Sequence, residues 1–117
     1  MNTVWPEELK VAKDRKSLTI SFNDGVTHTL PAEALRVMSP SAEVQGHSPE
    51  QRKTVGGKRN VMIIGMEPVG NYAVRISFDD LHDSGLFSWT YMRQLGDEFD
   101  ARWSVYENEL AEKGLTR

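Results

Sequence analysis

Cysteine is entirely missing from this chain of 117 residues. Without thiols, the chain can form no disulfide and can offer no thiolate to zinc or to an iron–sulfur cluster. The same absence removes cysteine nucleophiles and thiol redox chemistry. Enzymes and metal proteins that depend on cysteine are therefore excluded as function classes.

Long apolar runs are also missing. No stretch approaches the run of about eighteen apolar residues that a transmembrane helix requires. Residues 1–6 lack the basic start and the apolar stretch of a signal peptide. We therefore expect a single domain in the cytoplasm, without a membrane partner.

Several known catalytic sequence motifs are also absent. Residues 52–59 superficially suggest a phosphate-binding loop, but Arg52 occupies the place of its first glycine and no Ser or Thr follows Lys58. The chain has no Gly-x-Ser-x-Gly elbow, and no histidine opens a His-x-Asp pair. We therefore expect a protein that is not an enzyme.

Charge is present but unevenly spread, around a formal net charge of −3. Residues 97–113 are strongly acidic, whereas residues 47–60 carry four cations against Glu50 alone. These cations are Arg52, Lys53, Lys58 and Arg59. Because no aromatic residue lies among them, the pattern favours a solvated loop over a nucleic-acid contact. We also treat the four cations as candidate contacts with a protein partner.

Alternation of apolar and polar residues predicts strands, with Leu18, Ile20 and Phe22 on one face of the clearest one. The predicted strands are residues 8–13, Ser17–Phe22, 26–30, 61–66 and 72–78, with a brief extended segment at 85–87. Consecutive hairpins without crossover helices indicate an α+β domain. In it, antiparallel β-hairpins form a sheet packed against short helices and a C-terminal helix.

Capping residues predict where the helices lie. Pro31 should open a helix over residues 32–38, and Ser88 should cap a helix that Gly96 ends. Asp97 should cap the last helix, whose apolar side chains recur at helical spacing. That helix should carry two i,i+4 ion pairs, Glu98–Arg102 and Glu109–Lys113. Residues 40–60 read as a long, mobile surface loop with at most one helical turn.

His82 lies among Asp79, Asp80 and Asp83 in the most polar turn of the chain. Imidazole with carboxylates suits zinc or iron, and it also suits a general base oriented by an acid. The third interpretation is a solvated turn between a strand and a helix. Of the other histidines, His28 is expected to be half-buried by packing, and His47 has no evident partner.

Several segments together resemble a known family. They are Trp5–Pro6 and residues 18–25, 35–46, 67–72 and 82–89. In combination they resemble the N-terminal domain of gamma-butyrobetaine hydroxylase-like proteins, a domain of unknown function. The resemblance assigns residues 1–96 to this domain and leaves residues 97–117 as an acidic helix packed on it or extending it.

The resemblance also bears on metal binding. Zinc-holding members of the family use three cysteines after a Leu-Arg pair, and one later histidine. Here these positions correspond to Ser39, Ser41, Val44 and His82. Since a hydroxyl or a valine cannot replace a thiolate, we expect no cofactor, with iron or zinc at His82 as the weaker alternative. The two segments should still meet, as a polar pocket lined by serine.

The function that the resemblance implies is indirect. In the family this domain precedes a 2-oxoglutarate oxygenase, which this chain lacks, and it is similar to a domain fused to iron–sulfur scaffold ATPases. A stand-alone member is thus expected to be an accessory module that docks on a protein, linked through that partner to iron or iron–sulfur handling. The expected docking residues are His82, Asp83 and Ser84, with the four cations. The alternative is an iron- or zinc-binding protein using His82 and nearby carboxylates.

Overall fold

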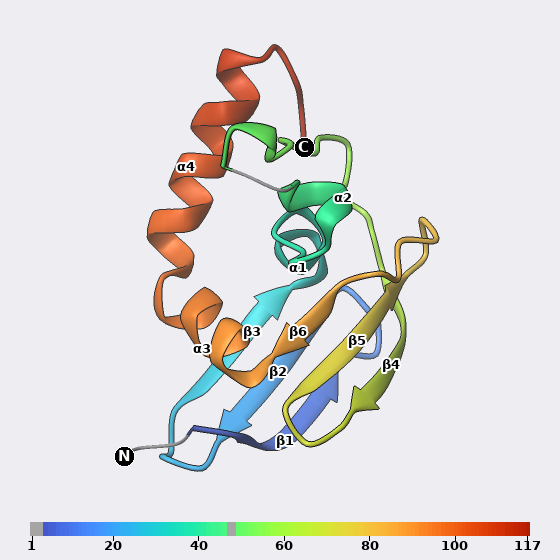
Figure 1. Cartoon of the computed structure of the whole chain (residues 1–117), viewed down its shortest axis with the longest axis vertical. Helices are drawn as coiled ribbons and strands as arrows, with labels where there is room; N and C mark the ends of the chain where they lie inside the picture. Colours follow the sequence, from blue (N-terminus) through green and yellow to red (C-terminus); the bar gives the residue numbers. More distant parts are fainter. Residues whose placement is uncertain (1–3, 47–48) are drawn as a thin grey trace.

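The structure is a computed structural model that describes residues 4–46 and 49–117. In Figure 1 the strands lie together in the lower part of the molecule, and the longest helix runs along one side of the upper part. The strands are β1 (Pro6–Val11), β2 (Ser17–Phe22), β3 (Thr27–Pro31), β4 (Ile63–Val69), β5 (Ala73–Phe78) and β6 (Leu86–Ser88). The helices are α1 (Ala32–Val37), α2 (Ala42–Gln45), the 3₁₀ turn η1 (Pro49–Gln51), α3 (Trp89–Asp97) and α4 (Phe99–Glu112).

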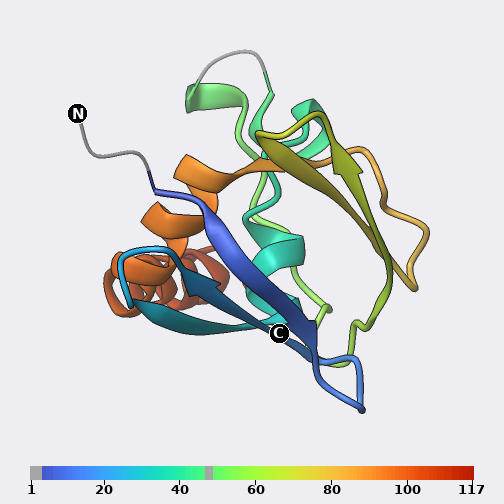
Figure 2. The same ribbon diagram turned by 90° about the horizontal axis from the view of Figure 1, so that it is seen from below.

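The strands form two antiparallel sheets, β1-β2-β3 and β4-β5-β6, which confirms the α+β class and the hairpins. In the first sheet, Leu18 pairs with Leu30 and Ile20 with His28. Gly25, with φ of 87°, supplies the positive φ that the tight β2–β3 turn needs. Figure 2 shows the two sheets from below, with α1 between them in this view.

One apolar core joins the sheets to the helices. The sheets are also linked directly, because the Ile63 amide donates to the Arg15 carbonyl at 2.8 Å. The alternating residues of β2 and β5 supply six of its fourteen buried side chains. The main buried members are Leu18, Ile20, Phe22, Leu30, Leu35, Ile63, Val74, Ile76, Phe78, Phe87, Met92 and Leu95.

The end of α3 differs from the prediction. Ser88 does cap α3, since its Oγ accepts the Tyr91 N–H at 3.1 Å, but the helix continues through Gly96 to Asp97. A glycine is needed at position 96 because the His28 side chain packs directly against the helix there. A Cβ on residue 96 would lie 2.2 Å from Cδ2 of His28. The prediction that Asp97 caps α4 is wrong, because its carboxylate instead bonds Nε2 of His28 at 2.7 Å and also pairs with Arg93.

The last helix packs on the rest of the chain. Tyr106 and Leu110 are buried against Val37 in a second small core, and the Tyr106 hydroxyl donates to the Val55 carbonyl at 2.6 Å. Beyond α4, Arg117 pairs with Glu33, which is buried. Residues 97–117 therefore contact α1 and the segment near residue 55.

Of the two ion pairs predicted within α4, one forms. Glu98 and Arg102 pair at 2.9 Å, as expected. The Glu109–Lys113 prediction is wrong: Glu109 pairs with Arg52, and Nζ of Lys113 donates to Thr54 Oγ1. The acidic face of α4 thus attracts residues 52–54, which lie beside it.

Residues 40–60 hold more structure than a simple loop. They contain α2, which is the expected helical turn, and they also contain η1. The Lys53 N–H donates to the Val44 carbonyl at 2.7 Å, which ties the segment back to α2. The mobility of this segment stays a prediction, and His47 lies outside the described residues. Among those described, no helix is both long and apolar enough to cross a membrane.

Candidate functional site

The structure brings together the two segments that the family resemblance connects. Ser39 and Ser41 lie between α1 and α2, and His82 and Ser84 lie between β5 and β6. Nε2 of His82 is 3.0 Å from Ser39 Oγ, and the Oγ atoms of Ser41 and Ser84 are 2.7 Å apart. Together with Glu43, these residues are called the His82 cluster below.

The centre of the His82 cluster is closed, unlike the open serine-lined pocket that the sequence suggests. Ser39 is 0% exposed and His82 is 5% exposed. A Cβ on Gly85 would lie 2.3 Å from Ser39 Oγ, so the backbone itself fills the remaining space. The cluster is therefore packed by its own side chains.

A hydrogen-bonded turn places His82. The Phe78 N–H donates to the His82 carbonyl at 2.9 Å, and the His82 N–H donates to Asp80 Oδ1 at 3.1 Å. Asp79 Oδ1 accepts the Met62 N–H at 2.9 Å. Asp79 and Asp80 thus stabilise the turn, as the third interpretation of this segment expected, and Asp83 remains exposed.

Asp80 also anchors two cations. Its Oδ2 lies 2.7 Å from Nε of Arg36 and 2.6 Å from Nζ of Lys58. Burial alone would raise the pKa of Asp80, but hydrogen bonds from Lys58, Arg36 and the His82 N–H lower it to about 2. Asp80 is therefore ionised at neutral pH, and Lys58 is committed to it.

His82 is held in its neutral form. Burial lowers the pKa of His82, the nearby Arg36 guanidinium lowers it further, and Glu43 and Asp80 only partly oppose this. Nδ1 lies 3.2 Å from the Glu43 carboxylate, which can only accept, so we assign the proton to Nδ1. Nε2 then accepts the Ser39 hydroxyl hydrogen, and both ring nitrogens are engaged.

These residues do not fit a zinc ion. Ser39 and Ser41 offer neutral hydroxyls, Val44 offers no ligand atom, and the remaining nitrogen of His82 already accepts from Ser39. Within residues 4–46 and 49–117, no group of three or more His, Asp or Glu side chains is placed to hold a metal. Because Nδ1 and Nε2 of His82 are both hydrogen-bonded within the protein, neither is free to remove a proton from a substrate.

The four predicted basic contacts fall in two places. Arg52 pairs with Glu109 on α4, and Lys53 lies beside it along the chain. Lys58 and Arg59 line a separate hollow with Arg117 near the C-terminal residues. The structure therefore separates these cations into two pairs, and Lys58 of the second pair reaches Asp80 in the turn that holds His82.

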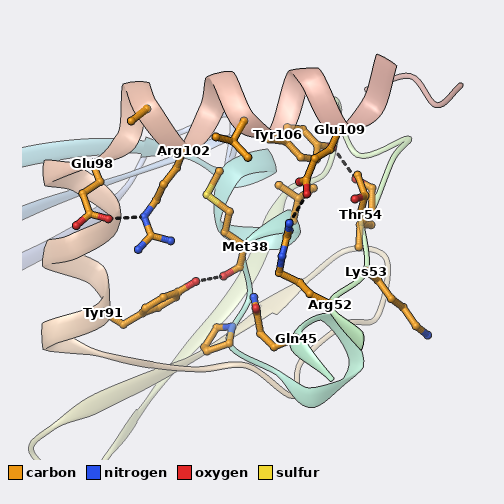
Figure 3. Close-up of a pocket in the computed structure, with 15 residues that line it drawn as sticks. Met38, Gln45, Arg52, Lys53, Thr54, Tyr91, Glu98, Arg102, Tyr106 and Glu109 are labelled. Carbon is orange, nitrogen blue, oxygen red and sulfur yellow. Dashed lines mark hydrogen bonds and ion pairs between the residues drawn. The ribbon is translucent and has the colours of Figure 1, made fainter. Parts of the chain in front are cut away.

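A cavity beneath α4 was missed by the sequence reasoning. Its volume is about 550 Å³, within the range of small-molecule sites. It lies between α4, α3, the α1–α2 connection and residues 52–55 (Figure 3). Because its walls come from four separate segments, no local pattern in the sequence signals it.

Comparison with known proteins agrees with this fold. A solution NMR structure of a protein is 47% identical over 96% of this chain and 88% of its own length, with a TM-score of 0.81. A second solution NMR structure is 41% identical over 99% and 86% of the two chains, with a TM-score of 0.85. The crystal structure of a protein of unknown function in the DUF971 family, from Acidithiobacillus ferrooxidans ATCC 23270, is 34% identical over 78% and 91%, with a TM-score of 0.65.

No curated protein matches the chain. The family model described as gamma-butyrobetaine hydroxylase-like, N-terminal, matches residues 9–93, which is most of the molecule. Strands β2 to β6, the His82 cluster and the first part of α3 lie in the matched region, which begins within β1. This chain is therefore a member of the gamma-butyrobetaine hydroxylase-like N-terminal domain family, and that family is one of unknown function.

Proposed function

We propose that this protein is a non-catalytic accessory module that docks on a protein partner through the turn after β5. The observation that carries the proposal is Leu81, which is 85% exposed and has a φ of 72°. A leucine is strained at positive φ, and its exposed side chain gains nothing from the core. An apolar side chain kept in this costly position suits contact with another molecule.

The turn that carries Leu81 is held in place by hydrogen bonds within the chain. The Leu81 N–H donates to the Phe78 carbonyl at 3.0 Å, and His82 supports the next residues from the buried side. A preorganised contact loses little conformational entropy on binding. His82 therefore serves as a positioning residue, and the contacts come from the exposed side chains around it.

The exposed side chains on the two segments that meet at the His82 cluster indicate the partner's chemistry. Leu86 is a second exposed apolar side chain, while Asp83 and Glu43 add exposed carboxylates on the same segments that meet at the His82 cluster. A complementary surface would offer an apolar pocket bordered by basic side chains. The exposed docking patch is thus Leu81, Asp83, Ser84 and Leu86, together with Glu43.

The family resemblance narrows the class of partner. Since the related domain is fused to iron–sulfur scaffold ATPases, we propose a cytoplasmic protein of iron or iron–sulfur handling as the partner. The metal itself would then be held by that partner. The alternative in which this chain holds iron or zinc is not favoured, because Nε2 of His82 is occupied by Ser39.

The experiment is a pull-down from cell extract with Leu81→Asn, because asparagine tolerates positive φ better than leucine does. The variant should melt no lower than the original protein and yet lose the specific partner. Tyr72→Asn, which removes another exposed apolar side chain, is the matched control and should retain that partner.

The captured protein is then identified, purified and titrated against both variants. Binding of the purified partner that falls at least about tenfold for Leu81→Asn alone supports the docking patch. Equal binding by the original protein, Leu81→Asn and Tyr72→Asn would overturn it.

A further inference from the structure

The cavity beneath α4 has an apolar interior. Val37, Met38 and Pro40 line one side, while Val55 and Val105 line others. The two tyrosine hydroxyls at its walls are already used, since Tyr91 donates to the Met38 carbonyl and Tyr106 donates to the Val55 carbonyl. These walls therefore offer hydrocarbon and aromatic surface to a ligand, with their hydroxyl groups satisfied internally.

Cationic donors at the cavity still have free hydrogen-bonding capacity. Arg102 bonds Glu98 through Nε, and neither of its Nη nitrogens has a hydrogen-bond partner among the described residues. Figure 3 shows its guanidinium projecting from α4 toward Tyr91, whose ring centroid lies 5.8 Å from Cζ. A guanidinium edge with two free nitrogens matches the two oxygens of a carboxylate.

The charge at the cavity favours an anion. Its lining holds three cations, Arg52, Lys53 and Arg102, against two carboxylates, Glu98 and Glu109. Both carboxylates are already paired with arginines, so the excess positive charge is that of Lys53, whose side chain extends away from the other lining residues in Figure 3. The half-buried Tyr91 phenol lies near Arg102 and Arg52, since both act to lower its pKa against the rise caused by burial.

We infer that this cavity binds a small carboxylate with an apolar body, its carboxylate on Arg102 and its hydrocarbon against Val37, Met38 and Val55. Neutral apolar molecules would leave the guanidinium nitrogens unused, and cations would meet the excess positive charge. This binding is independent of the docking patch, which lies on the turn after β5 and shares no residue with the cavity.

Octanoate is a suitable probe, with octanol and octylammonium as probes of equal chain length and different charge. In a titration followed by amide chemical shifts, octanoate should bind saturably and shift Val55, Ala101 and Val105, which line the cavity. Octanol should bind about tenfold more weakly, because it lacks the charge-assisted hydrogen bonds to Arg102. Octylammonium should bind no better than octanol.

Arg102→Gln should weaken octanoate binding about tenfold and leave octanol binding unchanged. Arg75→Gln is the matched control, because Arg75 is also an exposed arginine paired with a glutamate but lies on β5. It should bind octanoate as the original protein does. Amide spectra of both variants must match the original away from the substituted residue, which shows that they fold.

Three results would overturn the inference: octanol binding as tightly as octanoate, octanoate shifts away from the cavity, or equal octanoate affinity in Arg102→Gln. Octanoate binding by Leu81→Asn keeps the two proposals distinguishable. We expect this variant to bind octanoate as the original protein does, whether or not it loses the protein partner.

Discussion

The His82 cluster and the cavity beneath α4 are built from the same kinds of side chain but are used differently. Each adjoins an arginine paired with a carboxylate, Arg36 with Asp80 and Arg102 with Glu98. Around His82 the side chains of the cluster bond one another and the centre is closed, and Nη1 of the adjoining Arg36 is buried without a hydrogen-bond partner. Beneath α4 the hydroxyls are satisfied, while a guanidinium edge still faces open volume.

This difference shows that the polarity of a cluster does not by itself identify a binding site. Arg36 has a side chain only 12% exposed and serves the turn that holds His82, whereas the Arg102 side chain is 34% exposed and borders a cavity. What distinguishes the two is whether the guanidinium nitrogens without a hydrogen-bond partner are buried, as Nη1 of Arg36 is, or face open volume, as those of Arg102 do. The following predictions test whether the first region is structural and the second is not.

The largest effect is expected from adding a methyl group at Gly85, where the His82 cluster has no room for it. In Gly85→Ala, the new Cβ would meet Ser39 Oγ at 2.3 Å, so Ser39 or the backbone must move. We expect a loss of about 3 kcal/mol in unfolding free energy, measured by urea denaturation. Gly65→Ala is the control, since its Cβ would have only ordinary contacts, the nearest at 3.8 Å, and should cost less than about 1 kcal/mol. Equal losses would show that the cluster is not tightly packed.

The next prediction compares the two carboxylates that pair with arginine. Asp80→Asn should cost about 2 kcal/mol at neutral pH, since it removes the charge that Arg36 and Lys58 share and whose pKa is lowered to about 2. Because this pKa lies below the ordinary 3.8, the contribution is full above 3.8 and is lost as the pH falls toward 2. Glu98→Gln, at an exposed pair, should cost less than about 1 kcal/mol. A greater loss for Glu98→Gln would reverse the comparison.

The smallest of these effects is a pH dependence that arises from His82. Burial and the nearby Arg36 lower its pKa below 6.5 in the folded state, so the unfolded chain binds more protons in this range. The resulting stability is full above pH 6.5 and is lost as the pH falls through the lower folded pKa. The melting temperature should therefore drop between about pH 7 and about pH 5 by more in the original protein than in His82→Gln. Identical drops in both proteins would show that His82 does not contribute.

The sequence predicted local structure best where the signal lies within a few residues. Ser88 caps α3 because its hydroxyl needs only the amide three residues ahead, and the alternation in β2 places Leu18, Ile20 and Phe22 in the core. The prediction for Asp97 failed because His28, distant in sequence, and Arg93 compete for the same carboxylate. The prediction for Glu109 failed similarly, because Arg52 approaches α4 from another segment.

The candidate sites were predicted only in part. The meeting of residues 39–41 with residues 82–84 followed from the family resemblance, and the structure contains it. Whether that meeting point is open or closed depended on Gly85 and on how closely the chain approaches Ser39 there. The exposure and positive φ of Leu81 had no signal in the sequence, since a leucine in a turn reads the same whether buried or exposed.

The sequence by itself determined the absence of thiolate chemistry, the antiparallel hairpins and the membership of the family. These depend on composition, on two-residue and four-residue periodicity, and on matching segments, all of which can be read along the chain. Only the tertiary structure decided that the His82 cluster is filled and that a cavity remains beneath α4. Both are volumes left between segments up to tens of residues apart, and their size depends on how the packed elements approach one another rather than on any one segment.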